Sequence, residues 1–508
     1  MPDSTPASLT APTFRGTYGV LLGAGALVLS LGLLLPFVIA DTPAQNLSSS
    51  SGTTGGLGTT GTTGNNPAGT TGAAALPTAV ATPGSATGGT TGTVGTSGST
   101  STEGTGAVPP AASRRASDIG ITRDEIKLGV LIPQDSSSDA GGSFSDVVGH
   151  PKEQWGAYLA ELNAQGGILG RRVTPVFREY DGLDLDAQRA ACVYLTEQAK
   201  VFAIVNSGGF YGDPILCITQ QHKTPFIGQA GESLDFYQKS AGRYFSTTPN
   251  KDRVLRNMVA AAVADGAFKG KTVGILSREG IDAIPVDRSL KPALKRAGIT
   301  VKYEGRISSD DSAAQSQIPL EVQQMRSAGV DQILLTTGLI VANVFVQQAD
   351  SQRYYPQYMT SDFASGGADI YTIGMPASFA GSISYTALRT GEARAGIAES
   401  PTDAACRKTY ERRSGKKLDR TSTEYYLTVT ACGILEQFAR GMRTAGANPT
   451  RVSLSQGLQA IGPFDVPFSG AGSWSPGKFD APDVVRRTSW KADCRCWVPV
   501  TPFRRTAT

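Results

Sequence analysis

The run IKLGVLIP at residues 126–133 is mostly apolar, rich in β-branched residues and ended by a proline, which is typical of a buried strand. A helical pattern of apolar residues follows at residues 150–167 and stops at a glycine pair, as helices often do. The alternation continues with a second strand, a second helix and a third strand, at residues 171–181, 185–200 and 201–209. This order predicts a right-handed parallel α/β unit.

A sheet of this kind binds ligands outside the carboxyl ends of its strands. The loops after Pro133, Asn206 and Gly228 are therefore the expected binding loops of the first unit. A second series of alternating strands and helices begins near residue 271 and continues to about residue 387. Two successive α/β lobes of similar size predict a cleft between them, in which hinge closure encloses a small ligand.

The remaining parts of the chain complete the predicted organisation. The tail has three helical patterns and several short strands, and we expect it to return over the first lobe and the hinge. The predicted segments are a cytoplasmic N-terminus, an anchor or signal segment, a linker, lobe 1, lobe 2 and the C-terminal return, at residues 1–17, 18–40, 41–118, 119–248, 249–395 and 396–508.

The uncharged, apolar residues 18–40 are numerous enough to span a hydrocarbon core of about 30 Å as a helix. Arg15 precedes them and Asp41 follows, which favours an N-terminus inside the cell and the rest outside. Cleavage after Ala40, as in a signal peptide, is the alternative. Either interpretation places the remainder of the chain outside the cytoplasm. The linker that follows is rich in Thr, Gly, Ser, Ala and Pro and is expected to be a disordered tether.

Composition excludes several classes of function. The net charge of +4 is small for 508 residues, so nothing indicates binding to nucleic acid. The only histidines are His150 and His222, and no GxSxG motif occurs, which weighs against a hydrolase and against a histidine-rich metal site. We therefore expect no enzyme activity, no metal and no cofactor.

The cysteines become candidates for disulfides if the chain is exported. Cys192 and Cys217 lie on successive helices that flank the third strand, and Cys406 and Cys432 lie on consecutive helices of the tail. We predict these two pairs, because such helices are neighbours. The remaining two cysteines, Cys494 and Cys496, either pair locally or stay free.

The segment ELNAQGGILGRRVTPVFREYD at residues 161–181, after IKLGVLIP, resembles the opening of substrate-binding proteins of branched-chain amino acid ABC transporters. GGILGRRV is its most specific part, and the likeness extends over residues 121–490. This leucine/isoleucine/valine-binding family has the type I periplasmic-binding fold. The resemblance implies a clamshell that captures an amino acid or related small polar solute outside the cytoplasm and delivers it to a permease. A membrane-anchored sensor with the same fold is the alternative.

The resemblance also implies the site. The ligand carboxylate is expected at the loops after the third and fourth strands, and the ligand ammonium at an acidic residue of the second lobe. The corresponding residues are Gly208, Gly209, Phe210, Tyr211, Ala230, Gly231, Glu232 and Asp362.

Two departures from the family pattern bear on the solute. Phe210-Tyr211 and Glu232 stand where hydroxyl residues are expected, which favours a longer, aromatic, cationic or amide-bearing solute over a plain aliphatic amino acid. Structural roles remain open for the same residues. The glycine pair before Phe210 equally suits a tight turn. Packing at the lobe face is the alternative for the two aromatic residues, and a helix cap is the alternative for Asp362.

Overall fold

The computed structural model describes residues 111–134, 149–182 and 184–506. The predicted anchor at residues 18–40 and the linker up to residue 110 lie outside these residues, so both stay predictions. Within the described part of the chain, no helix is both long and apolar enough to cross a membrane.

The first lobe is built on a parallel sheet, whose described strands lie in the order β2-β1-β3-β4-β5. The strands are β1 (Glu125–Pro133), β2 (Arg172–Tyr180), β3 (Ala203–Asn206), β4 (Phe226–Gly228) and β5 (Tyr244–Ser246). The central strand β1 pairs with β2 and β3 on its two sides. The predicted strands therefore form the predicted parallel sheet.

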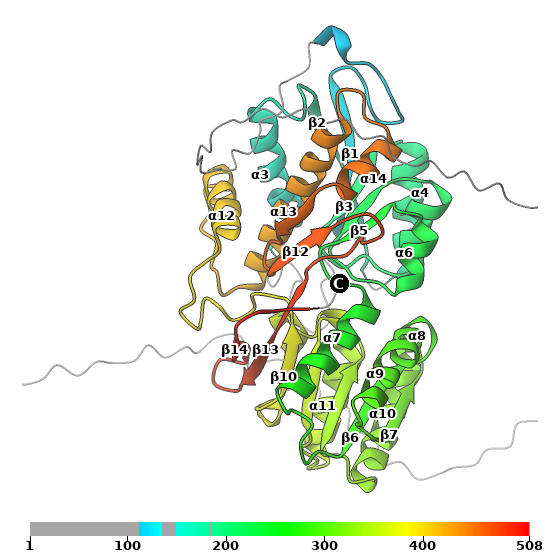
Figure 1. Ribbon diagram of the computed structural model, residues 1–508, viewed down its shortest axis with the longest axis vertical. Coiled ribbons are helices and arrows are strands. Elements are labelled where there is room, and N and C mark those ends of the chain that lie inside the picture. Colours follow the sequence, from blue (N-terminus) through cyan, green and yellow to red (C-terminus); the bar gives the residue numbers. More distant parts are fainter. Residues whose placement is uncertain (1–110, 135–148, 183, 507–508) are drawn as a thin grey trace, which may run out of the picture. The chain divides into compact units, whose positions relative to one another are not determined.

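Helices cover both faces of this sheet (Figure 1). On one face α3 (Pro151–Ala164) and α13 (Thr423–Ala445) pack in the same core as Leu128 and Val130. On the other face α4 (Leu185–Val193) packs in the core that contains Leu131. Alternate residues of β1 thus pack in opposite cores, which explains why the strand is mostly apolar on both of its faces. Two short helices, α5 (Asp213–Leu216) and α6 (Leu234–Ser240), complete this second layer, and the second of them was not predicted from the sequence.

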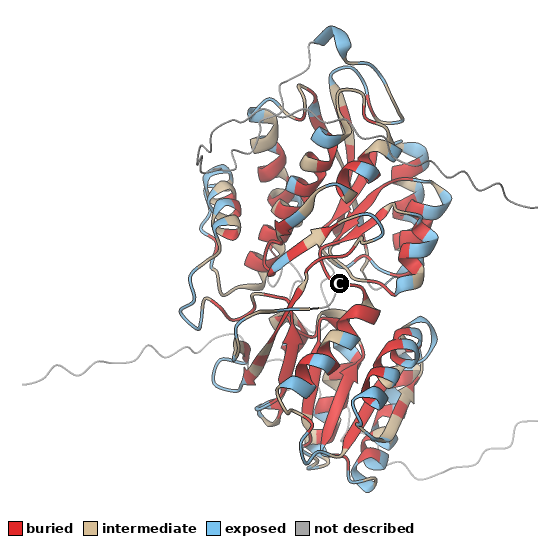
Figure 2. Ribbon diagram, in the orientation of Figure 1, coloured by how far each residue is buried: buried red, intermediate tan, exposed pale blue. Residues whose placement is uncertain are grey.

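The second lobe repeats the arrangement. Its parallel strands have the order β7-β6-β8-β9-β10, which is the order of the first sheet. They are β6 (Val273–Arg278), β7 (Val301–Ile307), β8 (Gln332–Thr336), β9 (Gln357–Ser361) and β10 (Ile383–Thr386). The strands of both sheets are largely buried (Figure 2), as expected for parallel sheets covered on both faces.

Two groups of helices sandwich the second sheet. One face carries α7 (Lys251–Ala264) and α9 (Lys291–Arg296), and the other carries α10 (Asp311–Ser327) and α11 (Leu339–Ser351). A short helix, α8 (Ala283–Pro285), follows β6.

The tail contributes to both lobes, which goes beyond the expected return over the first lobe and the hinge. Its helices α12 (Pro401–Ser414), α13 and α14 (Arg451–Gln459) lie on the first lobe, next to the small hairpin of β11 (Gly462–Asp465) and β12 (Ala471–Trp474). The later strands belong to the second sheet. There β13 (Val484–Lys491) pairs antiparallel with β10, and β14 (Cys496–Pro499) and β15 (Arg504–Arg505) pair with β13.

A buried charge network fixes the place where the chain crosses between the lobes. The Asp480 carboxylate accepts hydrogen bonds from the backbone N–H of Asn250 at 2.7 Å and from Arg253 Nε at 2.9 Å. Arg253 also pairs with Asp483 at 2.9 Å. Because the partners come from the start of α7 and from the tail, the network ties two of the crossing segments together.

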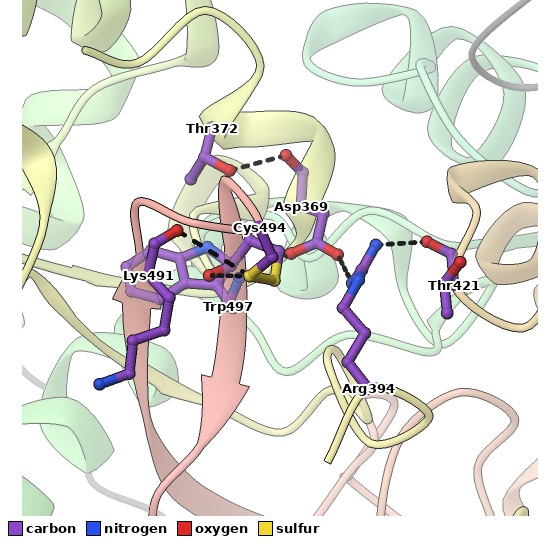
Figure 3. Close-up of a disulfide and its surroundings, with 8 residues drawn as sticks. Asp369, Thr372, Arg394, Thr421, Lys491, Cys494 and Trp497 are labelled. Atoms are coloured by element: carbon purple, nitrogen blue, oxygen red, sulfur yellow. Dashed lines mark hydrogen bonds and ion pairs between the residues drawn. A yellow bond between two sulfur atoms is a disulfide. The ribbon is translucent and has the colours of Figure 1, made fainter. Parts of the chain in front are cut away.

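The cysteines of the structure are joined in pairs. Cys192 is bonded to Cys217 and Cys406 to Cys432, as the helix adjacency predicts. The third pair, Cys494 with Cys496, closes the turn between β13 and β14 (Figure 3). Beside it the backbone N–H of Trp497 donates to Asp369 at 2.9 Å, and Asp369 pairs with Arg394.

Replacing Cys192 and Cys217 with serine is expected to lower the free energy of unfolding by about 2–4 kcal/mol, because a cross-link over 25 residues restricts the unfolded chain. Urea unfolding of the variant and the parent measures the loss. The matched control is the Cys494→Ser and Cys496→Ser variant, whose loop has a sequence separation of only 2, and which is expected to lose much less. Equal losses in the two variants would contradict the loop-length argument.

Candidate ligand-binding cleft

A cavity of about 390 Å³ lies between the two lobes. Its walls come from the carboxyl ends of strands in both sheets, including the loops after β1, β3 and β4 of the first lobe and after β6, β8 and β9 of the second. The volume is within the range of small-molecule sites. The cleft predicted from two successive α/β lobes is therefore present, at the sheet edge where such folds bind ligands.

The loop after β3 is held in shape by a buried side chain. Asn206 donates to Leu131 O at 3.0 Å and accepts from the backbone N–H of Gly208 at 3.0 Å. The Tyr180 hydroxyl donates to Gly208 O at 2.8 Å. Gly209 then has a φ of 76°, a left-handed conformation that favours glycine. Gly208 and Gly209 both line the cavity, on a loop whose backbone is held by hydrogen bonds with Asn206 and Tyr180.

The two aromatic residues that follow have separate roles. Tyr211 lines the cavity and is 39% exposed, so it lies where the sequence predicts an aromatic wall. Phe210 is 1% exposed and makes edge-on ring contacts with Tyr180 and Phe226. Phe210 therefore belongs to the first-lobe core, and we leave it out of the proposed site.

The loop after β4 brings Ala230, Gly231 and Glu232 to the cavity. A Cβ atom at Gly231 would lie 2.1 Å from Pro249 O, so only glycine fits against this crossing segment. The preceding residue, Gln229, donates its side-chain amide to the hydroxyl of Tyr426 on α13. The tail thus contributes a polar group to the cleft.

The carboxylate of Glu232 has an ion-pair partner within the protein. It is 1% exposed, accepts from the backbone N–H of Gly212 at 2.8 Å, and lies 3.0 Å from Lys251 Nζ. Lys251 also pairs with Asp282 of the second lobe at 3.0 Å. Burial on its own lowers the pKa of Lys251, but Asp282 and Glu232 together raise that pKa well above its ordinary value. The lysine therefore stays charged and neutralises Glu232.

Asp362 differs from Glu232 in the partners of its carboxylate. It follows β9, lines the cavity, and accepts from the Thr386 hydroxyl at 2.5 Å and from the backbone N–H of Ala387 at 2.7 Å. These donors are neutral, and within the described residues no lysine or arginine forms an ion pair with Asp362. The nearby Arg486 pairs with Glu392 instead, at 2.7 Å.

Burial raises the pKa of Asp362 to about 6, although the two hydrogen bonds and the charge of Arg486 oppose the rise. Its side chain makes no capping hydrogen bond to the short helix that follows. The helix-cap role that the sequence left open is thus not what Asp362 does in this structure.

Much of the remaining wall is apolar. It includes the first turn of α11, segments after β9 and β10, and part of α13. The residues are Leu339, Ile340, Val341, Ile370, Leu388 and Leu427. Sequence reasoning missed these residues, as well as Lys251 and Tyr426. A signal existed for Lys251 and for α11, because both directly follow strands of parallel sheets. None pointed to α13, whose place depends on tertiary packing.

Comparison with known proteins places the chain in a family. A family model described as "Periplasmic binding protein" matches residues 125–484. No curated protein matches the chain in sequence.

Solved structures share the fold. They include the solute-binding protein of an ABC transporter from R. palustris in complex with 4-hydroxybenzoate, with 16% identity, a TM-score of 0.59, and coverage of 76% of this chain and 98% of that one. A branched-chain amino acid ABC transporter protein from Thermus thermophilus with bound valine has 13% identity, a TM-score of 0.58, and coverage of 76% and 97%. A fatty acid ABC transporter substrate-binding protein from Thermomonospora curvata has 20% identity, a TM-score of 0.56, and coverage of 76% and 94%.

These structures differ in the ligands they are named for, and at these identities they show the fold alone. The family model, in contrast, spans most of the chain, including both lobes and the start of β13. The chain therefore belongs to the periplasmic binding protein family.

Proposed function

We propose that the protein is an extracytoplasmic solute-binding protein that closes its two lobes on a small solute and delivers it to the permease of an ABC transporter. The cavity between the lobes supports the proposal, because both sheets contribute strand-end loops to its wall. The fold likeness to substrate-binding proteins of ABC transporters agrees with it.

The solute that we propose carries an ammonium group and an apolar body, as a hydrophobic amino acid does. The observation that carries this choice is Asp362, which lines the cavity and whose carboxylate has two neutral donors but no ion-pair partner within the described residues. A buried carboxylate without a counter-charge is costly, and a ligand ammonium supplies that charge. Glu232 does not compete for this role, because Lys251 already neutralises it.

The rest of the site fits the other parts of such a solute. The backbone N–H of Gly208 is already bonded to Asn206, so we propose the backbone N–H groups of Gly209, Ala230 and Gly231 as the donors to a ligand carboxylate. The apolar wall around α11 would take the side chain. Similar structures include a valine complex and a 4-hydroxybenzoate complex, so fold likeness does not choose between ligands with and without an ammonium.

Asp362→Asn is expected to weaken binding of an amino acid about 30-fold or more, because removing one member of a buried charge pair costs about 2–5 kcal/mol. The probes are leucine, valine and phenylalanine, with the deaminated counterpart of each as a matched ligand. Calorimetry should show that the variant loses amino acid affinity and does not lose affinity for the deaminated compounds.

Glu232→Gln is the matched control variant and should lose far less amino acid affinity. If Glu232→Gln abolishes binding while Asp362→Asn stays within about threefold of the parent, the ammonium belongs to the first lobe. If the parent binds the deaminated compounds better than the amino acids, the proposed solute class is wrong.

The same substitution should stabilise the solute-free protein at neutral pH. The pKa of Asp362 is about 6 in the folded state and about 3.9 when unfolded. The folded state therefore holds the proton more tightly, and stability is lost as pH rises from about 4 through about 6.

Asp362→Asn removes this loss, on the order of 3 kcal/mol for a shift of about two pKa units. Urea unfolding at pH 4 and pH 7.5 should show the variant more stable than the parent only at the higher pH. A variant that is less stable than the parent at pH 7.5 would mean that the ionised carboxylate is a structural group.

A further inference from the structure

Lys251 is the first residue of α7 and lines the ligand cavity. Lys251 Nζ lies 3.0 Å from Glu232 of the first lobe and 3.0 Å from Asp282 of the second. The ring of Phe363 lies 5.5 Å from the same nitrogen. Two carboxylates and an aromatic ring thus surround one alkylammonium, and both carboxylates line the cavity themselves.

These groups are what a protein uses to bind an alkylammonium ligand: charge-assisted hydrogen bonds and an aromatic face. Here the cation is part of the chain. The carboxylate of Glu232 is held independently of the lysine, because the backbone N–H of Gly212 donates to its other oxygen at 2.8 Å. The acceptor therefore has a fixed position, and the lysine occupies a site that exists without it.

We propose that Lys251 is a specificity-determining residue, whose side chain fills a cation site in the cavity and so excludes solutes that carry a second cationic group. A tethered ammonium has an effective concentration in the millimolar range or above, so diamines and basic amino acids do not displace it. The role in specificity rests on the proposed function of the cavity, whereas the cation site itself does not. Of the three acidic residues in the described part of the cavity wall, Asp362 is then the one without an ion-pair partner for an incoming ammonium to replace.

Lys251→Ala tests the proposal by emptying the site. The substitution removes three methylene groups and the ammonium, which is the composition of propylammonium. Calorimetry with propylammonium chloride should show that the variant binds this cation at least tenfold more tightly than the parent. Propan-1-ol, which has the same alkyl chain and no charge, should bind the variant and the parent alike.

Two further variants complete the test. Lys251→Ala combined with Glu232→Gln and Asp282→Asn lacks both carboxylates and should bind propylammonium no better than the parent. If Lys251→Ala alone does not fold, Lys251→Ala with Asp282→Asn leaves one carboxylate unpaired and should still show the gain. The proposal is overturned if the folded variant shows no gain, or if the variant without carboxylates shows the same gain.

The outcome of the Lys251→Ala test can be distinguished from the outcome of the Asp362→Asn test of the proposed solute. A gain of propylammonium binding with no effect of Asp362→Asn on amino acids would leave the cation site standing and reject the solute. Loss of amino acid binding in Asp362→Asn without any gain of propylammonium binding in Lys251→Ala would support the proposed solute and reject the cation site.

Discussion

The carboxylate of Asp362 is buried beside neutral hydrogen-bond donors, and no lysine or arginine among the described residues forms an ion pair with it. Its position follows from strand pairing, because β9 and β10 are parallel neighbours whose carboxyl ends bring Asp362 next to Thr386 and Ala387. Gly367 leaves it room, since a Cβ atom there would lie 2.5 Å from the carboxylate oxygen. The second lobe thus holds a charge in place at a cost to its own stability, as functional sites often do. In our proposal the solute offsets that cost, so binding and lobe closure are driven by the same interaction.

The two lobes differ in what they bring to the cleft. The first lobe contributes backbone groups, including those of the loop after β3, which Asn206 and Tyr180 hold by hydrogen bonds. The second offers a carboxylate and the apolar first turn of α11. Each lobe has its own buried cores, and the network around Asp480 fixes crossing segments between them. This division suits closure of two rigid bodies about a hinge.

The sequence predicts the repeated strand–helix alternation well, because the central parallel strands are mostly apolar and many end at clear turn residues. It also indicates which loops form the site, since strand ends in such sheets share one edge. It does not predict that Phe210 turns into the core while Tyr211 faces the cavity, because that depends on the orientation of a loop. Nor does it predict that Lys251 neutralises Glu232 or that β13 joins the second sheet. Both depend on contacts between residues far apart in the chain.

The most direct test of the account is a crystal structure of the protein with the amino acid that it binds most tightly. The account predicts closed lobes around the ligand, with the ligand nitrogen at a charge-assisted hydrogen-bond distance of about 2.7–2.9 Å from a carboxylate oxygen of Asp362. Lys251 should remain between Glu232 and Asp282. A ligand bound with its nitrogen at Glu232, or with its nitrogen in solvent and Asp362 unpaired, would contradict it.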